Sequence, residues 1–276
     1  MQFERQAKAP TRRAVLTSLA GAAAMTLIAQ SAHADALANI EKAHKIRISI
    51  DPAAPPYSTK DAQLAYAGSE VDVARLLAQD WKVELEIVPT NPASRIPYLL
   101  TDKTDLVIST LSITPERAKV IDFSVPYSGI QVIIGAPKSM QLSALAELAG
   151  KRIATVRGST NDIELSKVVP AGAQVIRFDD DATAITAIIS GQADCYCTAP
   201  ALLAPVNKSK PELEMEPKIV VKTNLTGIGI RKGEAQLKAR LDEWVRENLR
   251  NGKLNAIYKK HHGADLSPEV TRAANA

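Results

Sequence analysis

The chain changes abruptly from apolar to polar in the segment that begins at residue 106. Residues 106–108 form an apolar run, which predicts a buried strand. The residues that follow offer short hydroxyls and a guanidinium: Ser109, Thr110, Ser112, Thr114 and Arg117. Thr114 followed by Pro115 predicts a capped helix start, and the planar fork of Arg117 suits a carboxylate. The segment therefore predicts a strand that delivers polar groups to a ligand cleft; the alternative is a capped turn with a surface arginine.

The first 34 residues are typical of an export signal. The basic head holds Arg5, Lys8, Arg12 and Arg13. It precedes an apolar stretch over residues 14–28 and a small-residue cleavage site at residues 32–34, which is the order of a cleavable signal peptide. Residues 11–16 also resemble a twin-arginine signal, so the Sec and twin-arginine routes both stay open. We expect a mature periplasmic protein that begins near Asp35.

The charge of the mature chain is almost balanced. The signal contains four of the 34 Lys and Arg residues and one of the 30 acidic residues. The mature chain therefore carries 30 basic and 29 acidic residues, a formal net charge of +1. This balance argues against a nucleic-acid partner and against a polybasic membrane patch.

Only two cysteines are present, Cys195 and Cys197. Two residues apart on a strand they point to the same face, and so close a pair forms a disulfide only with strain. We expect two buried small hydrophobic residues and no metal site or cofactor.

Strand and helix patterns alternate along the mature chain, which predicts an α/β fold with largely parallel sheets. Strands are predicted over residues 46–50, 83–87, 106–108, 153–156 and 175–178. Helices are predicted from a capping box at residues 69–72, from a turn at 157–160, from acidic caps at 179–181, and along an apolar stripe of Leu237, Leu241, Trp244, Val245 and Leu249. The length allows two lobes, each with its own core.

Three predicted strands end in segments rich in polar groups: residues 51–57, 109–117 and 157–160. Ligands of open α/β sheets collect beyond the carboxyl ends of the strands. Gly158, Ser159 and Thr160 at a helix start add backbone N–H groups and hydroxyls that suit a carboxylate.

Together these segments resemble the bacterial extracellular solute-binding proteins of family 3, the periplasmic receptors of polar amino-acid ABC transporters. The most specific part of the resemblance is residues 112–117 with residues 122–127. Further matching segments are residues 46–57, 68–72, 91–97, 158–160, 190–194, 251–254 and 257–258. The resemblance covers essentially the whole mature chain.

The resemblance implies a type II periplasmic-binding-protein fold, in which two hinge strands join two lobes and the ligand lies in the cleft between them. Lobe 1 would hold residues 40–129 and 228–265, lobe 2 residues 130–227, and residues 266–276 would be a flexible tail. It implies a monomeric receptor, not an enzyme, that binds a small amino acid or carboxylate and delivers it to an ABC transporter permease in the inner membrane.

Carried over residue by residue, the resemblance assigns the ligand's α-carboxylate to Arg117. Ser112, Thr110 and Ser109 would help from the same lobe, and Ser159 and Thr160 would reach the same carboxylate from the other lobe.

The chain departs from the family at residue 199. The family commonly has an Asp there, which pairs with the ligand's α-ammonium, whereas this chain has Ala199. Either Asp51, Glu70 or the Thr198 hydroxyl takes that role, or the ligand has no α-ammonium. Tyr57 remains as an aromatic wall of the site.

Two further arginines are candidates for the cleft. Arg95 lies in an Arg-Ile-Pro turn similar to that of acidic-amino-acid receptors, and Arg157 precedes Gly158. Both arginines facing the cleft would favour a ligand with more than one carboxylate, such as glutamate or aspartate. The alternatives are a solvated Arg157, an Arg95 that packs at a helix start, and a basic amino-acid ligand that faces Asp51 or Glu70.

An enzymatic alternative is a periplasmic dehydratase of the cyclohexadienyl type, because some proteins of this fold act on prephenate-like acids. Dehydration needs a placed general acid, for which Glu70 and Glu164 are the candidates. The sequence contains no other recognisable catalytic motif.

Overall fold

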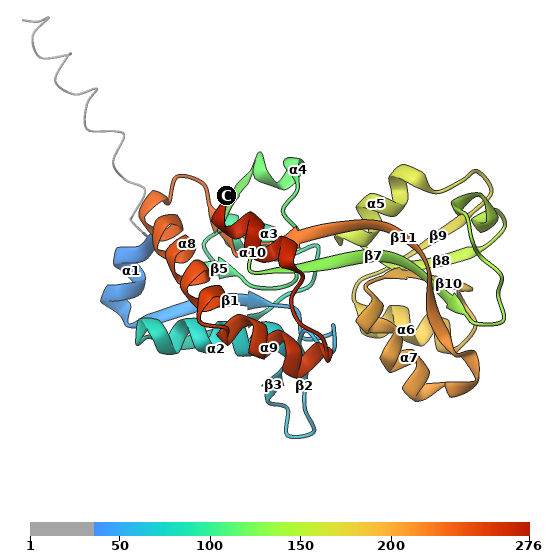
Figure 1. Cartoon of the computed structure of the whole chain (residues 1–276), viewed down its shortest axis with the longest axis horizontal. Helices are drawn as coiled ribbons and strands as arrows, with labels where there is room; N and C mark the ends of the chain where they lie inside the picture. The colour runs from blue at the N-terminus through green and yellow to red at the C-terminus, as the bar shows by residue number, and fades with distance from the viewer. Residues whose placement is uncertain (1–35) are drawn as a thin grey trace, which may run out of the picture.

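The computed structural model describes residues 36–276, so the predicted signal peptide over residues 1–34 lies outside the described residues. The described chain forms two five-stranded sheets. Figure 1 shows them as two lobes with helices around each sheet, connected by the long strands β7 (Ser128–Pro137) and β11 (Met215–Thr226). The predicted two-lobed α/β fold is confirmed.

The first sheet has the strand order β4-β1-β5-β12-β6. Its strands are β1 (Lys45–Ile50), β4 (Glu84–Pro89), β5 (Leu106–Val107), β6 (Ile121–Phe123) and β12 (Gly229–Arg231). β1 runs parallel to β4 and β5, while β12 is antiparallel to β5 and β6. Because β12 follows β11 in the chain, this sheet is completed only after the other lobe has been built. A two-stranded sheet of β2 (Thr59–Lys60) and β3 (Tyr66–Ala67) lies at one side.

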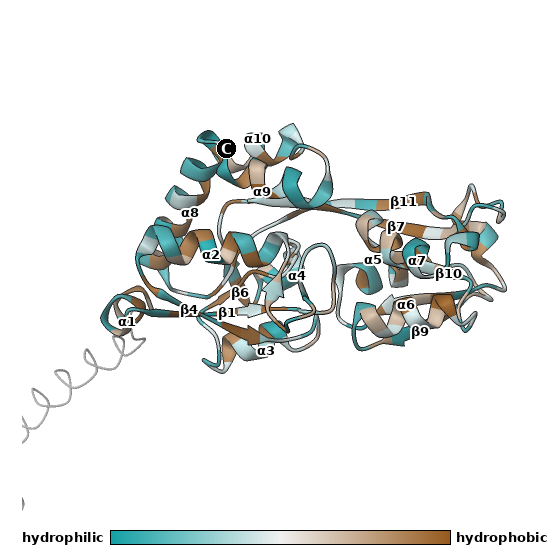
Figure 2. Cartoon of the chain, turned by 90° about the horizontal axis from the view of Figure 1, so that it is seen from below, coloured by the Kyte–Doolittle hydropathy of each residue, from teal (hydrophilic) through white to brown (hydrophobic). Residues whose placement is uncertain are grey.

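Seven helices belong to this first lobe. They are α1 (Ala36–Ala43), α2 (Ser69–Trp81), α3 (Arg95–Leu100), α4 (Pro115–Ala118), α8 (Ala235–Arg250), α9 (Lys253–His262) and α10 (Pro268–Asn275). The core contains the fully buried Ile46, Ile48 and Ile50 of β1. The predicted stripe of α8 packs there through Leu237, Leu241, Trp244 and Val245. Figure 2 shows the apolar colour on β1 and β4 and the hydrophilic colour on outer turns of α8.

The second sheet has the strand order β11-β7-β10-β8-β9. Its further strands are β8 (Arg152–Val156), β9 (Gln174–Phe178) and β10 (Cys195–Thr198), and its helices are α5 (Thr160–Val168), α6 (Asp181–Ile189) and α7 (Leu203–Ser209). Three 3-10 turns cover Leu145–Leu148, Pro200–Leu202 and Pro211–Leu213. β8 is parallel to β9 and β10, and β7 is antiparallel to β10 and β11. Cys195 and Cys197 are buried and free, as predicted.

The two connecting strands pair with each other over nearly their whole length. The register begins with Thr226 opposite Ser128 at the first lobe and ends with Met215 opposite Pro137 in the second. Two strands that cross side by side allow one lobe to rotate against the other while the ladder between them stays intact.

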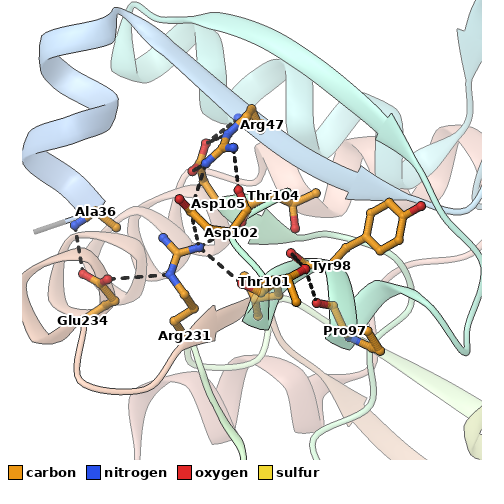
Figure 3. A network of polar contacts seen from close by, with 11 residues as sticks. Ala36, Arg47, Pro97, Tyr98, Thr101, Asp102, Thr104, Asp105, Arg231 and Glu234 are labelled. Atoms are coloured by element: carbon orange, nitrogen blue, oxygen red, sulfur yellow. Dashed lines mark hydrogen bonds and ion pairs between the residues drawn. The ribbon is translucent and has the colours of Figure 1, made fainter. Parts of the chain in front are cut away.

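A polar network closes the end of the first sheet that lies away from the second lobe (Figure 3). Arg47 donates through Nε and Nη2 to Asp105, at 3.2 and 2.6 Å, and through Nη1 to the carbonyl of Asp102 at 2.7 Å. Arg231 forms ion pairs with Asp102 at 3.0 Å and with Glu234 at 3.8 Å. The network joins β1, β12 and the segment before β5, so it fixes their relative positions.

The C-terminal residues correct one prediction. The sequence predicts a flexible tail over residues 266–276, but residues 268–275 form α10 and bury Val270 and Ala274. Arg246 of α8 donates to the carbonyl of Ala274 at 2.8 Å. The segment is ordered because its two apolar residues lie on the face that packs on α8.

The start of α2 also differs from the predicted capping box. The helix begins at Ser69, and the cap position is Gly68, with φ +125° and no side-chain cap bond. A side chain at residue 68 would lie 2.3 Å from the carbonyl oxygen of Tyr57. Glycine is therefore required, because only glycine adopts this φ without strain and without that collision.

Candidate functional site

A small cavity lies between the two lobes and is lined from both of them. The polar lining of the first lobe comes from Asp51, Arg95, Thr110 and Ser112. The polar lining of the second lobe comes from Ser159, Thr160, Asn161 and Asp181. The apolar walls are formed by Ala54, Tyr57, Pro92, Ile130, Ala199 and Leu202.

The topology explains why these residues meet. Asp51 follows β1 and Thr110 and Ser112 follow β5, two parallel neighbours in the first sheet. Ser159 and Thr160 follow β8 of the second sheet. Carboxyl ends of parallel strands lie at one edge of a sheet, and the two such edges face each other across the cavity.

The lobes are in direct contact around this cavity. Ala54 and Tyr57 of the first lobe are buried and belong to the hydrophobic cluster of the second lobe that contains Ala199 and Leu202. This packing removes the cavity walls from water, which strengthens electrostatic interactions inside. The structure therefore shows the lobes closed on each other.

Arg117 connects the two lobes. It lies in the short helix α4, whose predicted cap is confirmed: Thr114 accepts from the Arg117 backbone N–H and Pro115 opens the helix. Its Nη1 donates to the carbonyl of Ser112 at 3.0 Å and to Oγ1 of Thr160 at 2.9 Å. Its Nη2 donates to the carbonyl of Gly158 at 3.4 Å. Arg117 is not itself among the lining residues, but it bonds to two residues that are, Ser112 and Thr160. It thereby connects the first lobe directly to the second.

Burial, and to a smaller extent the positive charge of Arg95, lower the pKa of Arg117 to about 9. The only acids that oppose this effect from the described residues are Glu116 and Glu164. An anion placed beside this buried guanidinium would therefore strongly stabilise its charged form.

Arg95 is the most enclosed charged side chain of the cavity lining, with 2% of its surface exposed. Its Nη1 donates to the carbonyl of Ser109, while its Nε has no hydrogen-bond partner. Burial lowers the pKa of Arg95 to about 10, and the carboxylate of Asp51 acts in the opposite direction. Arg95 is therefore a desolvated cation with one N–H unused, at the cavity.

Asp51 is buried at the same lobe's edge. Its Oδ1 accepts from the backbone N–H of Ala53 at 3.0 Å, and burial raises its pKa. Its own backbone N–H donates to Oγ of Ser109 at 3.1 Å. Ser109 thus supports the loop from beneath and is not part of the cavity lining.

Glu70 also supports the site without lining the cavity. The backbone N–H of Thr110 and the hydroxyl of Tyr127 donate to its Oε2 at 3.1 and 2.5 Å. Thr110 has φ +47°, a strained conformation for a β-branched residue. Burial raises the pKa of Glu70. Its carboxyl group holds Thr110 in the lining and is not itself in the lining, contrary to the role considered for a basic ligand.

Asp181 is a lining residue that the sequence analysis misses. Asp180 supplies the cap of α6, since its side chain accepts from the Thr183 N–H at 2.8 Å. Asp181 is the next residue, 6% exposed, and its Oδ1 accepts from the hydroxyl of Tyr196. The sequence does contain a clue: residues 179–181 are three consecutive aspartates, and one helix cap uses only one of them.

The electrostatic surroundings of Asp181 favour its neutral form. Burial raises its pKa to about 7, and the negative charges of Asp51 and Asp180 act in the same direction. The hydrogen bond from Tyr196 and the charge of Arg95 lower the pKa. Asp181 is thus a carboxyl group that changes charge near neutral pH inside the cavity.

Besides Ser109 and Arg117, two further predicted binding residues lie outside the lining, Arg157 and Thr198. Arg157 is exposed and forms an ion pair with Asp179 at 3.7 Å. Its side chain points to the surface because the chain turns after β8, and this placement corrects the prediction of a cleft arginine. Thr198 is fully buried beneath the cavity wall, and its hydroxyl has no hydrogen-bond partner.

Within residues 36–276, no group of three or more His, Cys, Asp or Glu side chains is placed to hold a metal ion. Burial raises the pKa of both cysteine thiols, that of Cys195 to about 11. The same part of the chain has no helix with the length and apolarity needed to cross a membrane.

Comparisons with known proteins agree with this geometry. The family model of the bacterial extracellular solute-binding proteins, family 3, matches residues 46–264. The L-arginine-binding protein of Pseudomonas aeruginosa is 27% identical over 230 residues, which cover 80% of this chain and 89% of that protein. The L-cystine-binding protein TcyJ of Escherichia coli is 27% identical over 234 residues, which cover 84% and 87%.

Solved structures of similar fold are themselves covered almost completely. A variant of the arginine-binding protein ArgBP from T. maritima superposes with a TM-score of 0.76 at 30% identity, covering 83% of this chain and all of that one. The ancestral amino acid-binding protein AncCDT-1, a precursor of cyclohexadienyl dehydratase, superposes with a TM-score of 0.73 at 30% identity, covering 82% and 98%.

Proposed function

Because the chain belongs to the bacterial extracellular solute-binding proteins of family 3, we propose that it is the periplasmic receptor of an ABC transporter for a polar amino acid. It closes its lobes around the ligand as a monomer and delivers it to a permease in the inner membrane. Proteins similar to it bind L-arginine and L-cystine, as their names state.

The observation that carries this proposal is a set of unused polar atoms at a cavity between two lobes. The Nε of Arg95 and the Oγ of Ser112 are buried and have no hydrogen-bond partner within the described residues. A buried donor left unpaired costs about 1–3 kcal/mol, and folded proteins avoid such groups. A polar ligand that fills the cavity satisfies both atoms.

Closure follows from the position of the arginine between the lobes. Arg117 already bonds to Ser112 in the first lobe and to Thr160 and Gly158 in the second. We assign the ligand carboxylate to this junction, beside the Ser112, Ser159 and Thr160 hydroxyls. Each lobe alone leaves the carboxylate partly unpaired, whereas the closed lobes pair and desolvate it, so the ligand favours the closed state.

The charges of the lining favour a zwitterionic or cationic amino acid over a dicarboxylate. The preference for glutamate or aspartate rested on Arg95 and Arg157 together, and Arg157 lies outside the cavity. Asp51 and Asp181 both face the cavity with Arg95. A second ligand carboxylate would lie near two protein carboxyl groups, and like charges in a desolvated site repel.

Thermal unfolding of the ligand-stripped mature protein tests this function. The panel contains L-arginine, L-lysine, L-histidine, L-glutamine, L-glutamate, 2-oxoglutarate and succinate. A ligand that binds only the folded state raises the stability by RT ln(1 + [L]/Kd). We expect stabilisation by one or more zwitterionic or cationic amino acids, confirmed by calorimetry with one site per chain. No stabilisation by any amino acid would contradict the proposed function.

A second function is a dehydratase acting on a prephenate-like acid, supported by Asp181. This carboxyl group has a pKa of about 7 and faces a closed cavity, as a general acid requires. Glu164, considered for that role, instead pairs with Lys167 and Lys222 and is absent from the lining. Incubation with prephenate and detection of phenylpyruvate above the rate of an Asp181→Asn variant would support the enzyme.

A further inference from the structure

We infer that Asp181 and Asp51, which face the cavity from opposite lobes, together hold a cationic group of the ligand. Asp181 then supplies the acid that the second lobe lacks at Ala199. The inference rests on the proposed function, because it names the part of the ligand that this half of the cavity recognises.

The side chain of Asp181 is held in one position by a neighbouring hydrogen bond. It is the first residue of α6, and its Oδ1 is anchored by the hydroxyl of Tyr196 in β10. Tyr196 is itself fully buried, so the carboxyl group has a rigid support. No other hydrogen bond to the Asp181 side chain occurs within the described chain, which leaves Oδ2 for a ligand at the cavity.

The second lobe offers no alternative acid at the cavity. Among residues 36–276, its lining consists of Ile130, Ser159, Thr160, Asn161, Asp181, Ala199 and Leu202. Ala199 is fully buried in the same wall and carries no charge. Asp181 is therefore the only carboxyl group that this lobe presents to a ligand.

The charged groups around Asp181 indicate that the ligand group beside it is a cation. Asp51 faces it from the loop after β1, Asp180 precedes it on α6, Arg95 faces it from α3, and Tyr196 donates to it from β10. The lining thus brings two carboxyl groups together with one guanidinium. A ligand cation between Asp51 and Asp181 removes the repulsion between them and leaves Arg95 and Arg117 for carboxylate and neutral acceptors.

The arrangement assigns the two charges of the proposed ligand to different parts of the site. The carboxylate lies at Arg117 and Thr160, and the cation lies at Asp51 and Asp181. A molecule that carries both charges at a few bonds' distance, such as an α-amino acid, fits this order. Its analogue without the amino group does not.

The test compares Asp181→Asn with Asp179→Asn. Both changes remove one carboxylate from the same acidic run, but Asp179 is exposed and pairs only at the surface with Arg157. Calorimetry uses L-arginine, L-lysine and L-glutamine, with 5-guanidinopentanoate and glutaramate as the analogues of arginine and glutamine without the α-ammonium. Circular dichroism and thermal unfolding check that each variant folds.

We expect Asp181→Asn to weaken the amino acid that binds wild type by about 10- to 100-fold, as loss of a charge-assisted bond does. Asp179→Asn should change the affinity by less than about twofold. In wild type the affinity should rise about fivefold between pH 6 and pH 7 and about twofold more by pH 8, because the carboxyl must ionise to hold a cation. The variant should lack this rise.

Three results separate the possible failures. If wild type binds none of the amino acids, both the proposed function and the inference are wrong. If wild type binds an amino acid and Asp181→Asn binds it equally well, only the inference is overturned. If Asp181→Asn fails to fold, Asp51→Asn decides, because the inference gives both carboxyl groups the same cation: a loss of affinity of about tenfold or more supports it, and unchanged affinity overturns it.

Discussion

The charged groups at the two ends of the first sheet differ in whether their hydrogen-bonding atoms have partners. At the end away from the second lobe, Arg47, Asp105, Asp102, Arg231 and Glu234 pair with one another (Figure 3). At the cavity end, the Nε of Arg95 and the Oγ of Ser112 are buried without partners, and Thr110 has a positive φ. In the first arrangement the charged groups pair with one another, and only the Thr104 hydroxyl of the residues labelled in Figure 3 is buried without a partner. In the second, a buried cation at the cavity has an unused N–H, which a ligand would pair.

This difference shows which polar residues hold the fold and which serve binding. Paired polar groups stabilise or at least do not destabilise the folded state. Unpaired ones and strained backbone reduce its stability and persist at functional sites. The comparison therefore predicts that substitutions at the far end change stability without affinity and that substitutions at the cavity end do the opposite.

The largest expected effect is that of Arg117→Ala on affinity. We expect a loss of about 100-fold or more for the amino acid that binds wild type, because two charge-assisted bonds to its carboxylate are removed. The thermal midpoint without ligand should change little, since burial already disfavours this charge. Calorimetry measures the affinity, and Arg157→Ala is the surface control. Unchanged affinity of Arg117→Ala would contradict the carboxylate site.

The ligand-free protein should lose stability as the pH rises from about 4 to about 7 on account of Asp181. Its folded pKa of about 7 lies above its ordinary value of 3.8, so the fold favours the protonated form and the stability contribution is full below pH 4. We expect about 2 kcal/mol less stability at pH 8 than at pH 5 from this residue. Urea unfolding at several pH values measures it, and Asp181→Asn should show a flatter profile. Equal profiles would mean that Asp181 ionises normally.

At the far end, Arg47→Ala should lower the free energy of unfolding by about 1.5 kcal/mol. The variant leaves the carboxylate of Asp105, whose side chain is 10% exposed, without its guanidinium. Ligand affinity should stay within about twofold of wild type, because the site lies at the other end of the sheet. Urea unfolding measures the loss of stability and calorimetry measures the ligand affinity, both on the same sample. A large loss of affinity would break the comparison between the two ends.

The smallest expected effect is that of Ala199→Asp in the wild-type background. If Asp181 already pairs with the ligand cation, the added acid should change affinity by less than about threefold. It also places a new carboxyl group in a fully buried position, which lowers the thermal midpoint. Calorimetry and thermal unfolding measure the two effects. A gain of tenfold or more would show that the cation had lacked a partner.

Local patterns in the sequence predicted most of the fold. The alternation of isoleucines in β1, the stripe of α8 and the cap of α4 by Thr114 and Pro115 all depend on residues a few positions apart. The structure confirms each of them. Local pattern failed at residues 266–276, because a short helix that depends on packing against α8 has a weak signal of its own.

The site was predicted only in part for a different reason. Asp179, Asp180 and Asp181 are identical in type and adjacent, yet one is at the surface, one caps α6 and one lines the cavity. Only Asp181 belongs to α6, whereas Asp180 is its cap with extended backbone and Asp179 precedes the cap, so their roles depend on where α6 begins and how it packs beside the cavity.

The sequence alone determined the kinds of element, their order and the carboxyl ends that carry polar groups, because these properties arise between neighbouring residues. Only the tertiary structure decided that Arg95 faces the cavity, that Arg157 does not, and that Asp181 stands opposite Asp51. The last of these outcomes depends on segments more than 100 residues apart in the chain, which meet only when the two lobes close on each other.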